Sequence, residues 1–194
     1  TRPQPALIEA LAAVLADETL EAAFVALMLR PPSETDIARE IGRNIDPDAI
    51  YAARKALRVM IGKQLAPALA AAYTRMTSTA SYSPDAASAG KRALRNVALD
   101  LLAAGGEAEA LQRAAKQYAD ADNMTDRLAA LATLAQHPVP ERDTALADFY
   151  KRYADNPLII DKWFSLQASI PEPETLDRVR ALTKHQAFAM TNPN

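Results

Sequence analysis

Apolar side chains recur along this chain at the three- and four-residue spacing of an amphipathic α-helix. Leu20, Phe24 and Leu27 form one such set, and Leu128 and Leu131 begin another. No segment alternates apolar and polar residues over the length of a strand. The pattern therefore predicts an all-α fold, with helices at about 5–16, 19–29, 34–42, 47–76, 84–104, 107–120, 124–136, 141–154, 157–169 and 173–185.

Proline and glycine mark where these helices begin, break and end. A short polar residue followed by proline is a helix-opening signal, and it occurs at Asp46-Pro47, Ser83-Pro84 and Asn156-Pro157. Pro67 lies inside the longest predicted helix, which should kink or divide there because proline removes a backbone donor. Gly105-Gly106 should close the helix that Ser83 caps.

The chain is expected to form a single helical domain over residues 1–194, with a mobile loop near the Ser/Thr-rich run 77–83. It opens at Thr1 without an initiator Met. Asn192-Pro193 is a further helix-opening signal that only one residue follows. Both features favour the interpretation that the sequence is a fragment of a longer protein.

The predicted helices from residue 107 onward start at intervals of about 16–17 residues, which gives a helix-pair period of about 33. Regular helical hairpins of this length stack into an armadillo- or HEAT-like α-solenoid of antiparallel helix pairs, although a plain helical bundle is the alternative. A solenoid truncated at its C-terminal end exposes an apolar layer. That end carries Leu176, Val179, Leu182, Phe188 and Met190, so residues near 186–194 are expected either to lie along the domain as an irregular tail or to mediate self-association with a second copy.

Composition agrees with helices and excludes several function classes. Hydrophobic residues make up 49% and aromatic residues only 6% of the chain. A formal net charge of −2 gives no long-range attraction to nucleic acid or to an anionic membrane. No apolar run approaches the roughly 20 residues of a membrane span. The lack of cysteine fits a cytoplasmic location and removes disulfides and thiolate ligands.

Residues with catalytic or metal-binding chemistry are sparse. The histidines are His137 and His185, and neither has a second histidine four residues away, so we interpret both as helix-end residues favoured by the helix dipole. Ser88 and Lys91 match an S-x-x-K pattern, but the partner motifs of that enzyme class are lacking, which makes chance the better explanation. The glycines form no phosphate-binding loop. We predict no catalytic, cofactor-binding or metal-binding residue in this chain.

Two basic clusters, Arg54-Lys55-Arg58 and Lys91-Arg92-Arg95, are the candidates for a phosphate-binding face. Acidic residues elsewhere offset them, and exposed helix faces commonly carry such charges, so we do not predict nucleic-acid binding. The acidic pair Asp120 and Asp122 is interpreted as solvated because no partner acid or pocket is evident. Trp163 is predicted to anchor the core with Ile159, Ile160 and Leu166, and an exposed interface is the alternative.

Several short sequence segments, taken in the order in which they occur, resemble the C-terminal helical domain of bacterial aminopeptidases N. These are the zinc-dependent alanyl aminopeptidases of the gluzincin family. The resemblance covers nearly the whole chain. The segments that carry it are Asp46-Pro47-Asp48-Ala49-Ile50, Lys91-Arg92-Ala93-Leu94-Arg95-Asn96, Asn123-Met124-Thr125-Asp126 with Leu128-Ala129-Ala130-Leu131, Asp161-Lys162-Trp163-Phe164 with Leu166-Gln167-Ala168, and Met190-Thr191-Asn192-Pro193-Asn194.

This resemblance implies a multidomain parent enzyme that removes N-terminal residues from peptides in the cytoplasm. In that family the zinc site is an H-E-x-x-H helix with a downstream Glu, and a G-A-M-E-N segment binds the substrate amine. None of these motifs occurs in this chain, so the resemblance places zinc and catalysis in an upstream domain and transfers no site residue here.

The role implied for this chain is therefore non-catalytic. As the family's helical superhelix, it would scaffold and enclose the active-site cavity and limit access to short peptides, with the upstream catalytic domain as its partner. The alternative from the residues alone is a free-standing helical-repeat module that presents a concave surface to a protein partner.

Overall fold

The computed structural model describes residues 5–193, and in this range the regular elements are all helices. The all-α prediction is confirmed. The helices are α1 (Pro5–Ala16), α2 (Ala22–Met28), α3 (Glu34–Ile41), α4 (Pro47–Gln64), α5 (Ala66–Met76), α6 (Ala86–Gly105), α7 (Ala110–Asp120), α8 (Met124–Ala135), α9 (Pro140–Tyr153), α10 (Pro157–Ala168) and α11 (Thr175–Leu182).

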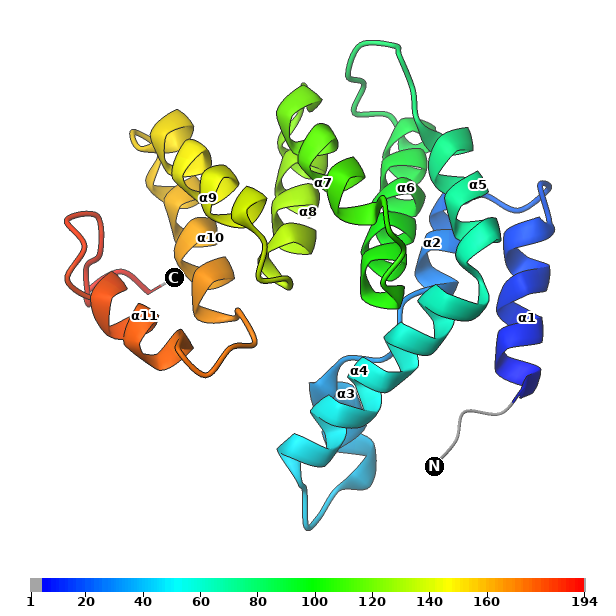
Figure 1. Cartoon of the computed structure of the whole chain (residues 1–194), viewed down its shortest axis with the longest axis horizontal. Helices are drawn as coiled ribbons and strands as arrows, with labels where there is room; N and C mark the ends of the chain where they lie inside the picture. Colours follow the sequence, from blue (N-terminus) through cyan, green and yellow to red (C-terminus); the bar gives the residue numbers. More distant parts are fainter. Residues whose placement is uncertain (1–4, 194) are drawn as a thin grey trace.

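Helical hairpins stand side by side along the long axis of the molecule (Figure 1). The α5–α6, α7–α8 and α9–α10 pairs follow one another, and α11 lies beyond the last of them. Helix α6 is the central element, because α2, α4, α5, α7 and α8 all pack against it. The hairpin of α3 and the first half of α4 projects from one side of this row (Figure 1). The arrangement is the predicted α-solenoid.

Most predicted helix boundaries have the expected chemical cause. Asp46 accepts a hydrogen bond from the backbone N–H of Ala49 at 3.0 Å and so caps α4. Asn156 caps α10 in the same way. The predicted long helix divides into α4 and α5, with Pro67 in the first turn of α5. Gly106 ends α6 in the left-handed conformation, at φ 77°.

Four helices, α2, α6, α7 and α11, begin two or three residues later than predicted, and the predicted cap of α6 is wrong. The cap of α6 is Asp85, whose Oδ1 accepts the backbone N–H of Ser88 at 2.9 Å, whereas the Ser83 hydroxyl donates to Asp85 Oδ2 at 2.5 Å. The helix that was expected from residue 84 therefore begins at Ala86. The helix expected from residue 19 begins at Ala22, because Asp17 accepts the backbone N–H of Thr19 at 2.9 Å in a turn.

The loop between α5 and α6 is helix-free over residues 77–84, as expected for the run predicted to be mobile. Its mobility stays a prediction, but its second half is anchored. The backbone N–H of Tyr82 donates to Asp122 Oδ2 at 3.0 Å, and Arg92 Nη1 donates to the Ser83 carbonyl at 2.8 Å. The Arg92 guanidinium also lies 4.7 Å from the centre of the Tyr82 ring.

The hydrophobic core consists of two clusters. The first joins α1, α2, α4, α5 and α6, with Leu29, Leu69 and Leu102 fully buried. The second joins α7 to α10 through fully buried side chains such as Leu131 and Phe149. Helix α6 contributes to both clusters, so it connects the two halves of the solenoid.

Trp163 is only 8% exposed and belongs to the second core, so its predicted anchoring role is confirmed. Its indole Nε1 donates to the Leu146 carbonyl at 2.9 Å. The segment after α11 runs as an irregular tail beside this core. Phe188 packs against the Phe164 ring, and Gln186 donates to the Tyr150 hydroxyl at 3.3 Å.

Candidate functional site

A groove of about 740 Å³ opens between α4, α6 and α8. Residues of the α2–α3 turn and of the α10–α11 turn also line it. Its walls carry an apolar surface with polar groups on one side, which is the usual composition of a small-ligand or peptide site. Its charged and imidazole side chains are Arg30, Glu34, Arg54, Lys55, Arg58, Asp100 and His137.

The first predicted basic cluster lines this groove from α4. Arg58 Nη2 lies 2.6 Å from Asp100 Oδ1 on α6, in a partly buried ion pair. Arg54 Nε donates to the Pro32 carbonyl at 2.8 Å, and its Nη1 lies 3.8 Å from Glu34 Oε1. These contacts fix both guanidinium groups at the edge of the groove.

The groove carries an excess of positive charge. Its lining includes the four cations Arg30, Arg54, Lys55 and Arg58, but only two carboxylates. Those two carboxylates belong to the ion pairs of Arg54 and Arg58. Within residues 5–193, Arg30 and Lys55 form no ion pair, and both side chains are exposed. This surface is therefore positive in a chain whose formal net charge is −2.

His137 lies directly after the C-cap of α8 and faces the same groove. Burial lowers the pKa of this imidazole below its ordinary value, Arg58 and Lys55 lower it further, and Asp100 opposes them. The neutral form therefore predominates at pH 7. The helix-end position agrees with the prediction, and the favourable effect of the helix dipole stays a prediction.

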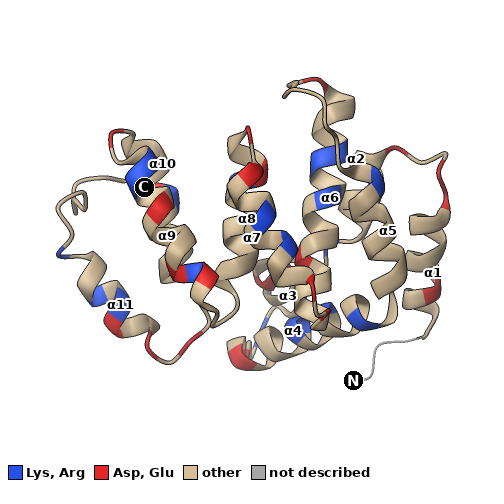
Figure 2. Cartoon of the chain, turned by 45° about the horizontal axis from the view of Figure 1, so that its top comes forward, with Lys and Arg blue, Asp and Glu red and all other residues tan. Residues whose placement is uncertain are grey.

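The second basic cluster lies elsewhere, so the fold does not combine the two clusters into one basic face. Arg92 packs on Tyr82, and the Arg95 guanidinium lies 5.4 Å from the centre of the Tyr73 ring. Neither of them lines the groove. Figure 2 shows basic and acidic residues interspersed along the solenoid, with basic positions along α4.

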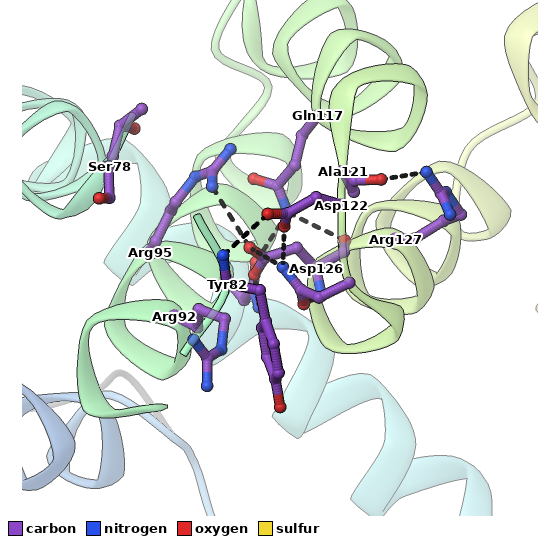
Figure 3. Close-up of polar contacts among 12 residues, drawn as sticks. Ser78, Tyr82, Arg92, Arg95, Gln117, Ala121, Asp122, Asp126 and Arg127 are labelled. Atoms are coloured by element: carbon purple, nitrogen blue, oxygen red, sulfur yellow. Dashed lines mark hydrogen bonds and ion pairs between the residues drawn. The ribbon is translucent and has the colours of Figure 1, made fainter. Parts of the chain in front are cut away.

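Arg95 belongs instead to a polar network around Asp126, shown in Figure 3. Asp126 is only 5% exposed, and its Oδ2 lies 3.4 Å from Arg95 Nη1. Asn96 Nδ2 donates to Asp126 Oδ1 at 2.9 Å. Gln117 Nε2 donates to Asn96 Oδ1 at 2.7 Å and to the Asp126 carbonyl at 3.1 Å. A buried carboxylate needs such partners to be tolerated, so this network has a structural role in joining α6, α7 and α8.

The sequence did not predict this network, although Asn96, Asn123 and Asp126 belong to the sequence segments that carry the family resemblance. Asn123 caps α8 by accepting the backbone N–H of Asp126 at 2.9 Å, and its Nδ2 returns a bond to Asp126 Oδ2 at 3.1 Å. A polar residue followed three positions later by an acid is the available local signal. The partners from α6 and α7 have no such signal.

The acidic pair singled out from the sequence is also occupied by local contacts. Asp120 Oδ2 lies 2.6 Å from Lys116 Nζ. Asp122 accepts hydrogen bonds from the Asn123 side chain, which chiefly lowers the pKa of Asp122, and from the backbone of Tyr82. Ser88 and Lys91 both lie on α6, where the backbone N–H of Ser88 is used by the Asp85 cap. No acid–base pair results from these residues.

The two histidines lie in different environments. His137 faces the groove, whereas His185 packs its ring against Tyr150, Trp163 and Phe164, with ring centres 4.9–5.5 Å apart. Across residues 5–193, no group of three or more His, Asp and Glu side chains is placed to hold a metal ion. In the same range no helix is both long and apolar enough to cross a bilayer.

Stacked helical hairpins with one central connecting helix define an α-solenoid domain of the armadillo type. The chain matches, over residues 1–194, the model of a family described as a domain of unknown function with ARM repeats (DUF3458_C). The chain belongs to this family.

Relatives of known name place this domain inside longer proteins. The chain is 40% identical over 186 residues to aminopeptidase N of Caulobacter vibrioides and 38% identical over 186 residues to that of Escherichia coli. These matches cover 96% of this chain but only 21% of each relative. The fold matches Legionella pneumophila aminopeptidase A, solved in complex with aspartic acid, with a TM-score of 0.85 and 24% identity, over 99% of this chain and 23% of that one.

Proposed function

We propose that this chain is the non-catalytic C-terminal helical domain of a zinc-dependent aminopeptidase that removes N-terminal residues from peptides. The observation that carries the proposal is 38–40% identity to two aminopeptidases N over almost the whole chain. The chain spans about a fifth of those relatives, with 21% coverage, which leaves room for a catalytic domain outside it.

In this proposal zinc and its ligands belong to the upstream catalytic domain. The described residues of this chain do not fit a zinc site, since they provide no cluster of three metal-ligating side chains. We therefore assign no chemical step to this chain. Its contribution is to hold the catalytic domain and to form part of the wall around its cavity.

The groove between α4, α6 and α8 supports this role. In this proposal the recess of about 740 Å³, with both apolar and charged lining, forms part of the wall that the solenoid contributes. Enclosing a peptidase site behind such a wall admits short peptides and excludes folded proteins. Short peptides in the cavity and the upstream catalytic domain are thus the partners that we propose. The cytoplasmic location stays a prediction.

The first test compares the isolated chain with the full-length protein that contains it. We expect residues 1–194 to show no hydrolysis of an alanyl amide with zinc added and to hold no zinc after purification, because the required ligands are elsewhere. The full-length protein should hydrolyse the same amide. Zinc-dependent turnover by the chain alone would contradict the proposal. A full-length protein without peptidase activity would favour the free-standing interaction module.

A second prediction concerns self-association through the C-terminal end of the chain. Leu182 packs against the second core and Phe188 against Phe164, whereas Leu176 is 60% and Met190 85% exposed. Replacing Leu176 and Met190 together by Ser should therefore shift the isolated chain toward monomer, because exposed apolar area drives association.

Sedimentation velocity measures this shift, and circular dichroism should show unchanged helicity. The matched control is Met28→Ser, which removes a 45% exposed apolar side chain of α2, away from α11 and the tail (Figure 1), and should leave association unchanged. An unmodified chain that stays monomeric at high concentration would contradict the prediction.

A further inference from the structure

The groove has charge and shape that point to a particular ligand. We propose that it binds acidic peptide segments, whose carboxylates contact the basic side of α4 and whose apolar side chains contact α6 and α8. This binding activity is additional to the proposed role of enclosing the catalytic cavity. It rests on that proposed function only because the ligand is taken to be a peptide.

The lining of the groove is complementary in charge to an acidic peptide. Arg54 and Arg58 already hold the two carboxylates of the lining, so Arg30 and Lys55 are the cations left to meet an incoming anion. The Lys55 ammonium lies 6.0 Å from the centre of the Tyr51 ring, and both residues line the groove. A peptide carboxylate placed there gains a charge-assisted hydrogen bond without breaking an existing ion pair.

Two ion pairs connect this cationic edge to neighbouring elements. Arg58 reaches across to Asp100 on α6, so the helices that form two walls of the groove are tied together at the point where the ligand would bind. The Arg54 contacts tie the same edge to the α2–α3 turn. The ordering cost of binding therefore falls on the exposed Arg30 and Lys55 side chains and not on these two guanidinium groups.

The apolar floor selects a peptide over a nucleic acid or a simple inorganic anion. The apolar part of the lining includes Val97 and Leu101 of α6, which are 9% and 1% exposed, and the half-buried Ala129 and Ala132 of α8. Phosphate backbones gain nothing from such a surface, whereas peptide interfaces pair an apolar centre with a polar rim. The volume of about 740 Å³ is that of a site for several side chains.

The neutral state of His137 fits the same ligand. An uncharged imidazole can accept or donate a hydrogen bond to a peptide group, and it adds no further charge to an edge already lined by Arg58 and Lys55. The carboxylate-binding function is thus left to the lysine and arginine side chains.

The test is fluorescence anisotropy on residues 1–194 with a labelled eight-residue peptide of Glu, Leu and Ala, blocked at both ends. A second peptide has Gln in place of every Glu. We expect saturable binding of the acidic peptide, at least tenfold weaker binding of the Gln peptide, and weaker binding of the acidic peptide as salt is raised. Lys55→Glu should weaken acidic-peptide binding at least tenfold, and Lys55→Gln should weaken it less.

The matched control is Lys151→Glu, which makes the same charge change at an exposed site of α9 outside the groove and should alter affinity less than twofold. Thermal melts of all variants check folding. Equal binding of the two peptides, or an equal effect of the two Glu variants, would overturn the inference. Displacement of the peptide by a lower concentration of a single-stranded oligonucleotide would reassign the groove to nucleic acid and overturn it too.

Blocked peptides separate this inference from the proposed function, because they cannot be substrates of an aminopeptidase. If the full-length protein hydrolyses alanyl amides and the chain does not bind the acidic peptide, only the inference fails. If the chain binds the peptide and the full-length protein has no peptidase activity, the proposed function fails and the groove remains a binding surface.

Discussion

Trp163→Ala should lower the free energy of unfolding by about 3–5 kcal/mol, the range for truncating a buried aromatic side chain. Trp163 is 8% exposed in the second core. Its ring packs on Tyr150 and Phe164, with ring centres 5.0 and 5.2 Å away. The substitution would leave a large cavity between α9 and α10 and would remove the hydrogen bond from Nε1 to the Leu146 carbonyl.

Chemical denaturation of the two proteins measures the difference. Leu158→Ala is the matched control, since it truncates a 68% exposed side chain of the same helix and should change stability by less than about 0.5 kcal/mol. A loss below about 1 kcal/mol for Trp163→Ala would contradict the core assignment and would return Trp163 to the role of an exposed interface residue.

Gly62→Ala should also destabilise the fold strongly, by about 3 kcal/mol, although alanine is the better helix former. Helices α4 and α6 approach so closely here that a Cβ on Gly62 would lie 2.1 Å from the Leu101 carbonyl oxygen and 2.7 Å from the Gly105 backbone nitrogen. Both are backbone atoms, so neither can rotate away. The two helices would have to separate, which opens the first core.

Gly90→Ala provides a graded comparison, because its Cβ would meet the Ala23 backbone nitrogen at 3.0 Å. At this position alanine gains about 1 kcal/mol in helix propensity over glycine, and this gain should offset much of the destabilisation that the tighter contact causes. Equilibrium unfolding of both variants tests the difference. If Gly62→Ala is as stable as the unmodified chain, the close approach of α4 and α6 is wrong.

Local sequence signals predicted the helices because their causes are local. Asp46 and Asn156 cap helices through bonds to residues three positions away, and Gly106 ends α6 through its own φ angle. The one misassigned cap shows the limit of the same reasoning. Ser83 and Asp85 both have suitable side chains, and only the path of the chain into α6 selects Asp85.

The groove could be predicted only in part. The cluster Arg54-Lys55-Arg58 was visible as basic positions on one predicted helix, because three residues within five positions share a helix face or its edge. Its partner Asp100 lies 42 residues from Arg58 and had no distinguishing signal. The second basic cluster looked equivalent in the sequence, yet it supports the loop and the Asp126 network.

The sequence by itself determined the helical class, the hairpin repeat and the apolar face that buries Trp163, because periodicity and caps act within a few residues. The tertiary structure alone decided which helix faces meet: Gly62 against Gly105, Arg58 against Asp100, and Arg95 against Asp126. Each of these pairs joins residues more than 30 positions apart, and no local preference specifies such a contact. They depend on the packing angles of whole helices, which the combined side chains of both cores fix.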